Sequence, residues 1–237
     1  MSCFKQKHDA FEYRRAIDGG MVSHMSVIDK QSSADRFILQ DVSWATYESL
    51  LKDLGDRRWP RLTYDRGILE IMSPHSEHEG TSWILASIVD LTLVEQDIDS
   101  CNVGMTTFRS VDQKRGFQPD SSFYIKNAAR VRGKKVLDMA VDPPPDLLIE
   151  IDVSNDSLNK FPLFASFGVP EVWRFAETLE IWILDRGKYV RQTVSRAIPI
   201  LDEKLVSELL QAGRSEKRPT WVRQARNRIR ARIQGQG

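Results

Sequence analysis

With 237 residues, 41% of them hydrophobic and 28% charged, and a net charge of +1, the chain has the size and composition of one globular domain with modest extensions. No apolar run approaches the roughly 18 residues of a membrane span, and the charged first residues lack the apolar stretch of a signal peptide, so we expect a cytoplasmic protein with no membrane partner. The two cysteines, Cys3 and Cys101, exclude a disulfide framework and a cysteine-based zinc site, which leaves carboxylates, histidines and backbone oxygens as ligands for any metal.

The N-terminal part of the chain is predicted to be an extension, followed by a domain of residues 36–213. Residues 1–35 show no regular period, and we interpret them as largely disordered. The first expected helix follows Ser43, which is a good N-cap, and ends at Gly55.

Strands and helices alternate through the middle of the chain. Residues 61–64 and 68–72 indicate two strands joined as a hairpin. Pro74 then introduces a longer helix. Its apolar residues recur at helical spacing and are Trp83, Ile84, Ile88, Leu91 and Val94. Strands are expected next at 103–111 and 121–125.

The second half of the domain contains the segment that is expected to be most buried. Residues 127–145 are polar and basic and predict a surface loop. Residues 146–153 form a nearly continuous apolar run, which is typical of a strand at the centre of a sheet covered on both faces. The remaining elements are a helix at 159–167, strands at 169–175, 179–185 and 188–194, and a helix at 202–213. This order predicts a mixed sheet flanked by helices, in the α/β or α+β class.

From Arg214 onward the sequence is strongly basic and contains one acid, Glu216. The basic residues are Arg214, Lys217, Arg218, Arg223, Arg226, Arg228, Arg230 and Arg232. A basic tail at 214–237 on a correspondingly acidic body suggests an electrostatic arm for a polyanion. A solvated helical or disordered tail without that role is the alternative.

Glu150 is the strongest local anomaly, because it lies inside the apolar run. Alternate residues of a strand share a face, so Glu150 and Asp152 are expected to project together. Two carboxylates on one face of a buried strand repel each other and lose hydration, and a cation between them would relieve both effects. The alternative is that the strand turns toward solvent there, or that an arginine neutralises the pair.

Asp120 is the natural partner of Glu150. It stands after Pro119 at the start of a predicted strand, although a proline followed by an aspartate is by itself a common turn element. Hard divalent ions such as Mg²⁺ bind one or two carboxylates together with water and substrate phosphate. The two acids together therefore predict a metal site.

Lys160 lies near the start of a predicted helix, where the helix dipole disfavours a cation. Its neighbours at helical spacing are Leu163, Phe164 and Phe167, so it borders the buried face. A lysine in this place suggests a specific anion, such as a cluster of carboxylates or a scissile phosphate. A surface lysine whose stem lies along apolar neighbours is the alternative.

Three segments, residues 118–120, 146–154 and 160–173, together resemble the restriction endonuclease (Uma-two) family, which belongs to the PD-(D/E)XK nuclease superfamily. Residues 67–74, with His78 shortly after them, resemble the entry segment of the same family. The resemblance runs from about residue 42 to about residue 184.

This resemblance implies a restriction-endonuclease-like core that hydrolyses phosphodiester bonds with Mg²⁺ or Mn²⁺. Asp120 and Glu150 would bind the metal, and the backbone carbonyl of Ile151 would complete the set of ligands. Lys160 would orient or activate the attacking water and stabilise charge on the phosphorane. The lysine of the superfamily normally lies two residues after the acid, where this chain has Asp152. Asp152 is therefore either an additional ligand or a salt-bridge partner.

Glu70 and His78 are further candidates for the site. Glu70 lies between Leu69 and Ile71, whose side chains point the other way, so it faces either solvent or the cleft. We expect His78 near the cleft, in support of the metal ligands or in contact with phosphate. His75 and His78 could instead form a zinc pair, but no third ligand is evident in the sequence.

The functional expectation is a DNA endonuclease that cuts double-stranded DNA, for which a two-fold dimer would be suited. The basic tail and a basic loop at 126–135 would hold the phosphate backbone. A catalytically degenerate nucleic-acid-binding or interaction module with the same fold is the alternative, which Asp152 supports. A carboxylate-pair glycosidase is a third class; the sequence lacks an aromatic-rich sugar platform, although Trp173 and Trp182 leave some room for one.

Overall fold

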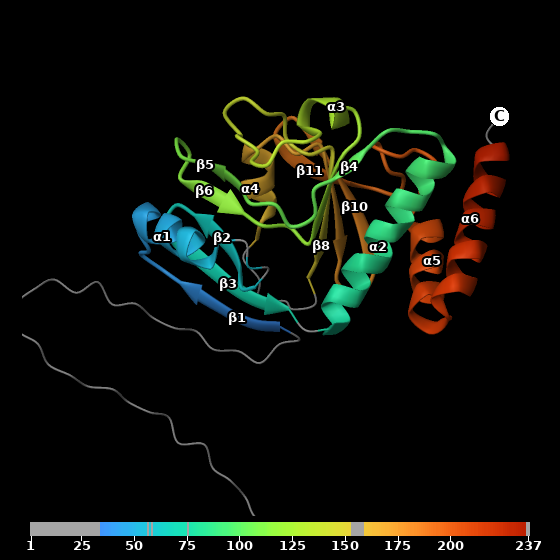
Figure 1. The fold of residues 1–237 in the computed structure, drawn as a ribbon, viewed down its shortest axis with the longest axis horizontal. Coiled ribbons are helices and arrows are strands. Elements are labelled where there is room, and N and C mark those ends of the chain that lie inside the picture. Colours follow the sequence, from blue (N-terminus) through green and yellow to red (C-terminus); the bar gives the residue numbers. More distant parts are fainter. Residues whose placement is uncertain (1–33, 56, 58, 75, 153–158, 236–237) are drawn as a thin grey trace, which may run out of the picture.

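The computed structural model describes residues 34–55, 57, 59–74, 76–152 and 159–235. These residues form two β-sheets and six helices in an α+β fold, which confirms the predicted class (Figure 1). The first sheet lies at one side of the second sheet, and the helices of residues 76–95, 203–215 and 218–234 lie at its other side. Among the described residues no helix is long and apolar enough to cross a membrane.

The first sheet is wholly antiparallel, with the strand order β1-β3-β2-β6-β5. Its strands are β1 (Ala34–Leu39), β2 (Arg61–Asp65), β3 (Ile68–Pro74), β5 (Phe108–Ser110) and β6 (Arg115–Phe117). The predicted hairpin is confirmed, because Asp65 pairs with Ile68 across a two-residue turn. Both turn residues, Arg66 and Gly67, have positive φ, as the tight turns of twisted hairpins require.

Helix α1 (Trp44–Leu54) covers one face of this sheet. It begins as predicted, because the hydroxyl of Ser43 accepts a hydrogen bond from the backbone N–H of Thr46 at 3.1 Å, and it ends at Gly55. Tyr47 of the helix is fully buried and stacks on Tyr64 of β2. The opposite face of the sheet carries polar side chains of the candidate site.

The second sheet is mixed, with the strand order β11-β10-β9-β8-β7-β4. Its strands are β4 (Cys101–Asn102), β7 (Ser121–Tyr124), β8 (Leu147–Ile151), β9 (Glu171–Phe175), β10 (Leu179–Asp185) and β11 (Lys188–Gln192). β8 runs parallel to β9 and antiparallel to β7, and all of its residues are buried. The apolar run therefore forms a central strand, as predicted.

Helices α2 (Ser76–Glu95), α5 (Glu203–Ser215) and α6 (Arg218–Gln234) lie together against one face of the second sheet (Figure 1). Ile149 of β8 and Trp173 of β9 point into the core between this face and the helices. In α2 the predicted apolar face is only partly correct, because Trp83 and Val94 are exposed while Leu85 is buried in the core.

The predicted helix stop at Gly213 is wrong, because α5 continues to Ser215. A Cβ atom on Gly213 would lie 2.7 Å from a methyl carbon of Ile84 and 3.1 Å from the ring of Trp221. The glycine therefore permits the close approach of α5 to α2 and α6 and does not end the helix.

The basic segment expected as a tail is helical and packs on the domain. Trp221, Ala225 and Ile229 of α6 are buried in the main core. Several of its arginines form ion pairs within the chain: Arg226 and Arg230 with Glu95, Arg228 with Glu208, and Arg232 with Asp202. These arginines are therefore engaged with acids of the body, which disfavours their use as an arm for a polyanion.

Three further differences from the expected elements follow from contacts that are distant in the sequence. Strand β1 was not predicted, and it pairs with β3 along its whole length. Within the expected strand at 103–111, only the residues of β5 form a strand in the structure. The predicted loop at 127–145 contains the short helix α3 (Ala128–Val131) and is held by a hydrogen bond from the hydroxyl of Tyr124 to the carbonyl of Pro143.

Candidate functional site

The polar faces of the two sheets meet at the candidate site. In the second sheet Glu150 pairs with Arg174, so both side chains project from the face opposite the helical core. In the first sheet Arg36 and Arg61 both pair with Met72, and Glu70 lies two residues away on the same strand. These three side chains therefore share the face that is turned away from α1. The site combines residues from both sheets.

Asp120 lies where the chain passes from the first sheet to the second, between β6 and β7. Its Oδ2 accepts a hydrogen bond from the backbone N–H of Ile151 at 2.6 Å. Ser121 pairs with Ile149 in the antiparallel register of β7 and β8, so Asp120 stands beside the Glu150 end of β8. The structure thus brings the two predicted acids to the same end of neighbouring strands.

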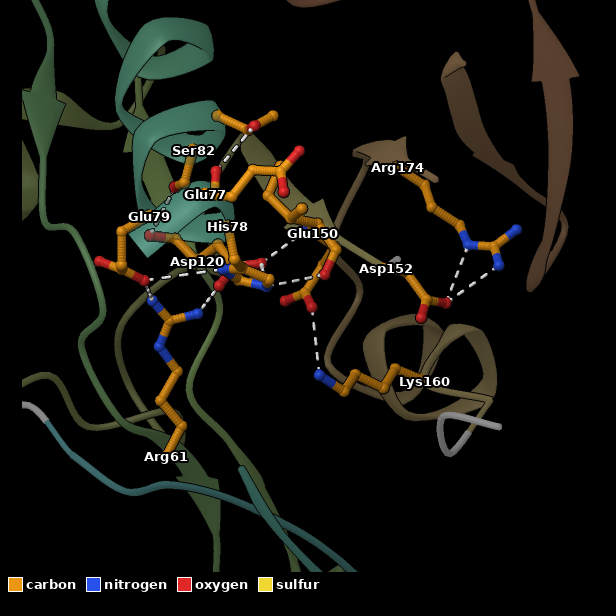
Figure 2. Close-up of polar contacts among 12 residues, drawn as sticks. Arg61, Glu77, His78, Glu79, Ser82, Asp120, Glu150, Asp152, Lys160 and Arg174 are labelled. Carbon is orange, nitrogen blue, oxygen red and sulfur yellow. Dashed lines mark hydrogen bonds and ion pairs between the residues drawn. The ribbon is translucent and has the colours of Figure 1, made fainter. Parts of the chain in front are cut away.

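Arg61 is the principal residue that sequence reasoning missed. Its guanidinium forms an ion pair with Asp120 and a hydrogen bond to Oε1 of Glu79 at 2.6 Å (Figure 2). Burial lowers the pKa of Arg61, and the carboxylates of Glu79 and Glu150 act in the opposite direction. The arginine balances negative charge at this end of the site.

Lys160 lies between two buried acids. Its Nζ is 3.2 Å from Oε2 of Glu150 and 3.4 Å from Oε1 of Glu70. Burial lowers the pKa of Lys160, but the carboxylates of Glu150 and Glu70 raise it more, so the net pKa is above its ordinary value. Lys160 is the residue directly before helix α4 (Phe161–Ser166), and its side chain reaches across to β8 (Figure 2). The side chain is therefore a charged partner of both acids, and Glu70 faces the cleft, one of the two predicted alternatives.

Asp152 has basic partners of its own. Arg174 donates to its Oδ2 at 2.9 Å, and Nη1 of Arg36 lies 3.9 Å from its Oδ1. Glu150 is paired with Lys160 instead. The cation expected between Glu150 and Asp152 is therefore not needed to balance their charge. For Asp152 the structure has the predicted alternative, in which arginines neutralise the carboxylate.

His78 supports the same corner of the site from the first turns of α2. Its Nε2–H donates to the carbonyl oxygen of Ile151 at 2.9 Å, and the same atom lies 3.5 Å from Asp120 Oδ2. His78, Glu79 and Asp120 each offer a possible ligand atom, and these atoms lie within 4.8 Å of one another. His75, the other half of the expected zinc pair, lies outside the described residues.

Two carboxylate oxygens of the site are buried without a hydrogen-bond partner among the described residues: Oδ1 of Asp120, which faces Arg61 in the ion pair, and Oε1 of Glu150. Ionised carboxylate oxygens in such a place are costly unless a donor or cation satisfies them. Asp120, Glu150 and the carbonyl of Ile151 offer hard oxygen atoms of the kind that Mg²⁺ and Mn²⁺ bind.

A cavity of about 330 Å³ opens directly beside these groups. Glu150, Asp152 and Lys160 lie in its wall, and its remaining polar and aromatic residues are Arg36, Asn159, Phe161, Phe164, Arg174 and Trp182. The structure thus joins Asp120, Glu150, Lys160, Asp152 and Glu70 in one site.

The basic loop at 126–135 does not join this site. β7 leads away from Asp120 to this loop, and β8 returns from it to Glu150, so the loop lies at the far end of both strands. Within it, Arg132 pairs with Asp99 and Lys134 with Asp142.

The missed residues left different signals in the sequence. Arg61 opens a strand after Pro60, which is also the pattern of an exposed strand end. Arg174 could have been found, because it is a charged residue between the aromatic residues Trp173 and Phe175 of strand β9. Glu79 is one of two acids in the first turn of α2, where acids are common for helix stability alone.

Comparison with known proteins gives a consistent result. A family model, Uma2, described as "Putative restriction endonuclease", matches residues 44–213. A solved structure from Anabaena variabilis, described as a "putative nuclease belonging to DUF820", superposes with a TM-score of 0.51 at 15% identity. The superposition covers 71% of this chain and 99% of that chain, and it shows a shared fold. No curated protein matches this sequence.

Proposed function

We propose that this chain, which belongs to the Uma2 family of restriction-endonuclease-like proteins, is a metal-dependent endonuclease that hydrolyses phosphodiester bonds in DNA. Membership of a nuclease family supports hydrolase activity on nucleic acid in general. The metal, the DNA substrate and the roles of single residues are the finer parts of this proposal.

The observation that carries the proposal is the buried, unpartnered Oε1 of Glu150. It lies in the same site as Asp120 and beside the charged lysine at position 160. An acid in this state is poorly explained by packing alone, because its desolvation opposes folding. A divalent cation held by Asp120, Glu150 and the carbonyl of Ile151 would satisfy it. Such a cation supplies Lewis-acid chemistry to phosphodiester hydrolysis.

The chain's own residues have distinct tasks in this proposal. Lys160 keeps its proton because two carboxylates hold it, so it orients the attacking water and stabilises negative charge on the phosphate. It does not act as a base. Glu70 positions Lys160, and Arg61 balances the charge of Asp120 and Glu79 before a metal enters. His78 positions the carbonyl of Ile151.

The DNA backbone would approach over the start of α2. Arg214 donates to the hydroxyl of Thr81 at 2.8 Å, and the guanidinium of Arg218 lies 4.0 Å from the ring centroid of Trp83. Lys217 and Arg218 form no ion pair with the residues that the structure describes, so their charge is available to phosphate. We propose double-stranded DNA as the substrate and a homodimer as the acting form.

The test combines metal binding with cleavage. In Asp120→Asn and Glu150→Gln variants, Mn²⁺ affinity measured by calorimetry should fall by at least about tenfold, and Mg²⁺-dependent cutting of plasmid DNA should be abolished. Glu77→Gln is the matched control, because Glu77 is an exposed acid in the first turn of α2, next to His78 of the site. Unchanged cutting by both site variants would reject the assigned residues.

A second candidate function is a degenerate nucleic-acid-binding module with the same fold. Two of the proposed ligands already have partners, since Arg61 pairs with Asp120 and His78 donates to the carbonyl of Ile151. In such a module these contacts would replace the metal permanently. Nucleic-acid binding without any Asp120-dependent binding of Mn²⁺ would favour this candidate.

A further inference from the structure

The cavity beside Glu150 and Lys160 has a wall suited to a flat aromatic group. Phe161, Phe164, Val172 and Trp182 line it. Val172 and Trp182 are register partners on β9 and β10, so they project side by side from the same face of the second sheet. The rings of Phe161 and Trp182 lie 5.0 Å apart, centre to centre, and are tilted by 51°. Neither ring is fully buried, so each can accept a further contact.

The remaining wall carries both hydrogen-bond donors and hydrogen-bond acceptors. Arg36, Asp152, Asn159 and Arg174 line it, together with Glu150, Ile151 and Lys160 of the proposed site. Three of the lining residues are basic and two are acidic, so the cavity is slightly positive. This combination provides both donors and acceptors at the edge of a group that stacks on the aromatic wall.

We infer that this cavity receives one unstacked nucleobase of the substrate strand, next to the phosphate that lies at Glu150 and Lys160. This inference rests on the proposed nuclease function. A nucleobase has two apolar faces and a rim of donors and acceptors, which match the two walls. The volume of about 330 Å³ is at the lower end of the range for small-molecule pockets, which is adequate for a single base.

This arrangement has a consequence for the form of the substrate. Bases inside a duplex are stacked on their neighbours and cannot enter a cavity in the protein. A duplex substrate must therefore extrude one nucleotide next to the cut, or be locally single-stranded there. Sequence preference would then arise from the base that fits the cavity best, read by the groups around Asp152 and Arg174.

The experiment compares two single-stranded ligands that share a backbone. A thymidine decamer and an abasic deoxyribose-phosphate decamer of the same length are titrated against the full chain in EDTA, with fluorescence anisotropy as the readout. The thymidine decamer should bind more tightly, and Trp182→Ala should weaken its binding roughly fivefold to 100-fold, the range for loss of one stacked base. Binding of the abasic decamer should not change.

Two variants control for structural damage. Trp182→Phe keeps an aromatic surface and should retain most of the preference for bases. Phe37→Ala removes an exposed aromatic side chain on β1, outside the cavity lining and away from the start of α2, and should leave the preference intact. Equal binding of the two decamers by the wild-type chain, or an equal loss for both in Trp182→Ala, would overturn the inference.

The outcome is independent of the test of the proposed function. Metal-dependent cleavage without base preference would overturn the cavity assignment and leave the nuclease intact. A base preference that depends on Trp182, in a protein that cuts nothing and binds no Mn²⁺, would support the cavity and reject the nuclease.

Discussion

Arg61 and Asp120 form an ion pair in which the two side chains are 3% and 1% exposed. Arg61 begins β2 of the first sheet, and Asp120 directly precedes β7 of the second sheet. The ion pair therefore joins the two sheets. Removal of one partner from a buried pair leaves an uncompensated charge, which is more destabilising than the pair is stabilising. In the proposed metal site, Arg61 would therefore balance the charge of Asp120 before a metal binds.

Substitution of Arg61 with methionine should therefore destabilise the metal-free protein by about 3–5 kcal/mol. Because Asp120 then lacks a cation, Mn²⁺ should restore a larger share of stability in the variant than in the wild type. Thermal melting with and without millimolar Mn²⁺ measures both effects.

The matched control for this prediction is Arg66→Met. Arg66 also pairs with an aspartate, Asp65, at 3.0 Å, but 67% of the arginine side chain is exposed. Its loss should change stability by less than about 1 kcal/mol, as for most surface pairs. If Arg61→Met melts like Arg66→Met and gains nothing from Mn²⁺, the arginine is not a substitute for a metal.

Glu150 and Lys160 stand out in the sequence because each violates a local rule, whereas Asp120, in a common Pro-Asp element, is proposed only as the partner of Glu150. Glu150 interrupts an apolar strand and Lys160 stands at the unfavourable end of a helix, and both anomalies are visible within a few residues. Arg61 obeys every local rule, since an arginine at a strand end is ordinary. Its burial arises when two sheets meet, and that event depends on residues far along the chain.

The fold was likewise predictable where an element has a local sequence signal, and not where it depends on a partner far along the chain. Tight turns such as Arg66-Gly67 carry their own conformational signal, and the hairpin predicted there is present. Helix α6 could have been found, because Trp221, Ala225 and Ile229 recur every four residues. Strand β1 could not, because β3, with which it pairs in the described part of the chain, lies 30 or more residues away.

Lys160→Met should separate metal binding from catalysis. The variant loses a cation beside Glu150, so its affinity for Mn²⁺ should be equal or higher. Its cleavage rate should nevertheless fall by roughly 100-fold to 1000-fold, because negative charge on the phosphate is no longer stabilised. Calorimetry and single-turnover cleavage provide the two readouts.

A parallel loss of metal affinity and of cleavage in Lys160→Met would show instead that the lysine only holds the site together. Glu70→Gln is informative here as well. It keeps a hydrogen-bond acceptor for Lys160 but removes one charge, so its cleavage should fall less than that of Lys160→Met.

Gly213→Ala should destabilise the protein by about 1–3 kcal/mol, because an added methyl group overpacks the contact of α5 with Ile84 and Trp221. Gly80→Ala is the control in a helix with open space around it, and it should be neutral or stabilising by up to about 1 kcal/mol. Denaturant titration of both variants checks this, and equal effects would argue against close packing at Gly213.

Trp221→Ala tests whether α6 belongs to the folded domain, which we propose. Trp221 is 1% exposed, and its indole N–H donates to the carbonyl of Leu209 at 2.8 Å. Its truncation should cost about 3–5 kcal/mol, as for other large core side chains. Arg223→Ala, on the solvated side of the same helix, should change stability by less than about 0.5 kcal/mol. A small effect of Trp221→Ala would favour a separate tail.

Residue 152 lies two positions after Glu150, where the nucleases that this sequence resembles usually have their lysine. Asp152 occupies that position here, with Arg174 at 2.9 Å and Arg36 at 3.9 Å. A lysine at 152 would face two arginines after their shared carboxylate is removed, so it would be repelled from the site. The double variant Asp152→Lys/Lys160→Met should therefore stay as inactive as Lys160→Met alone and melt at a lower temperature. Recovery of cleavage by the double variant would show that position 152 can still present an amine to the phosphate, and that the arginines do not determine which residue carries the lysine role.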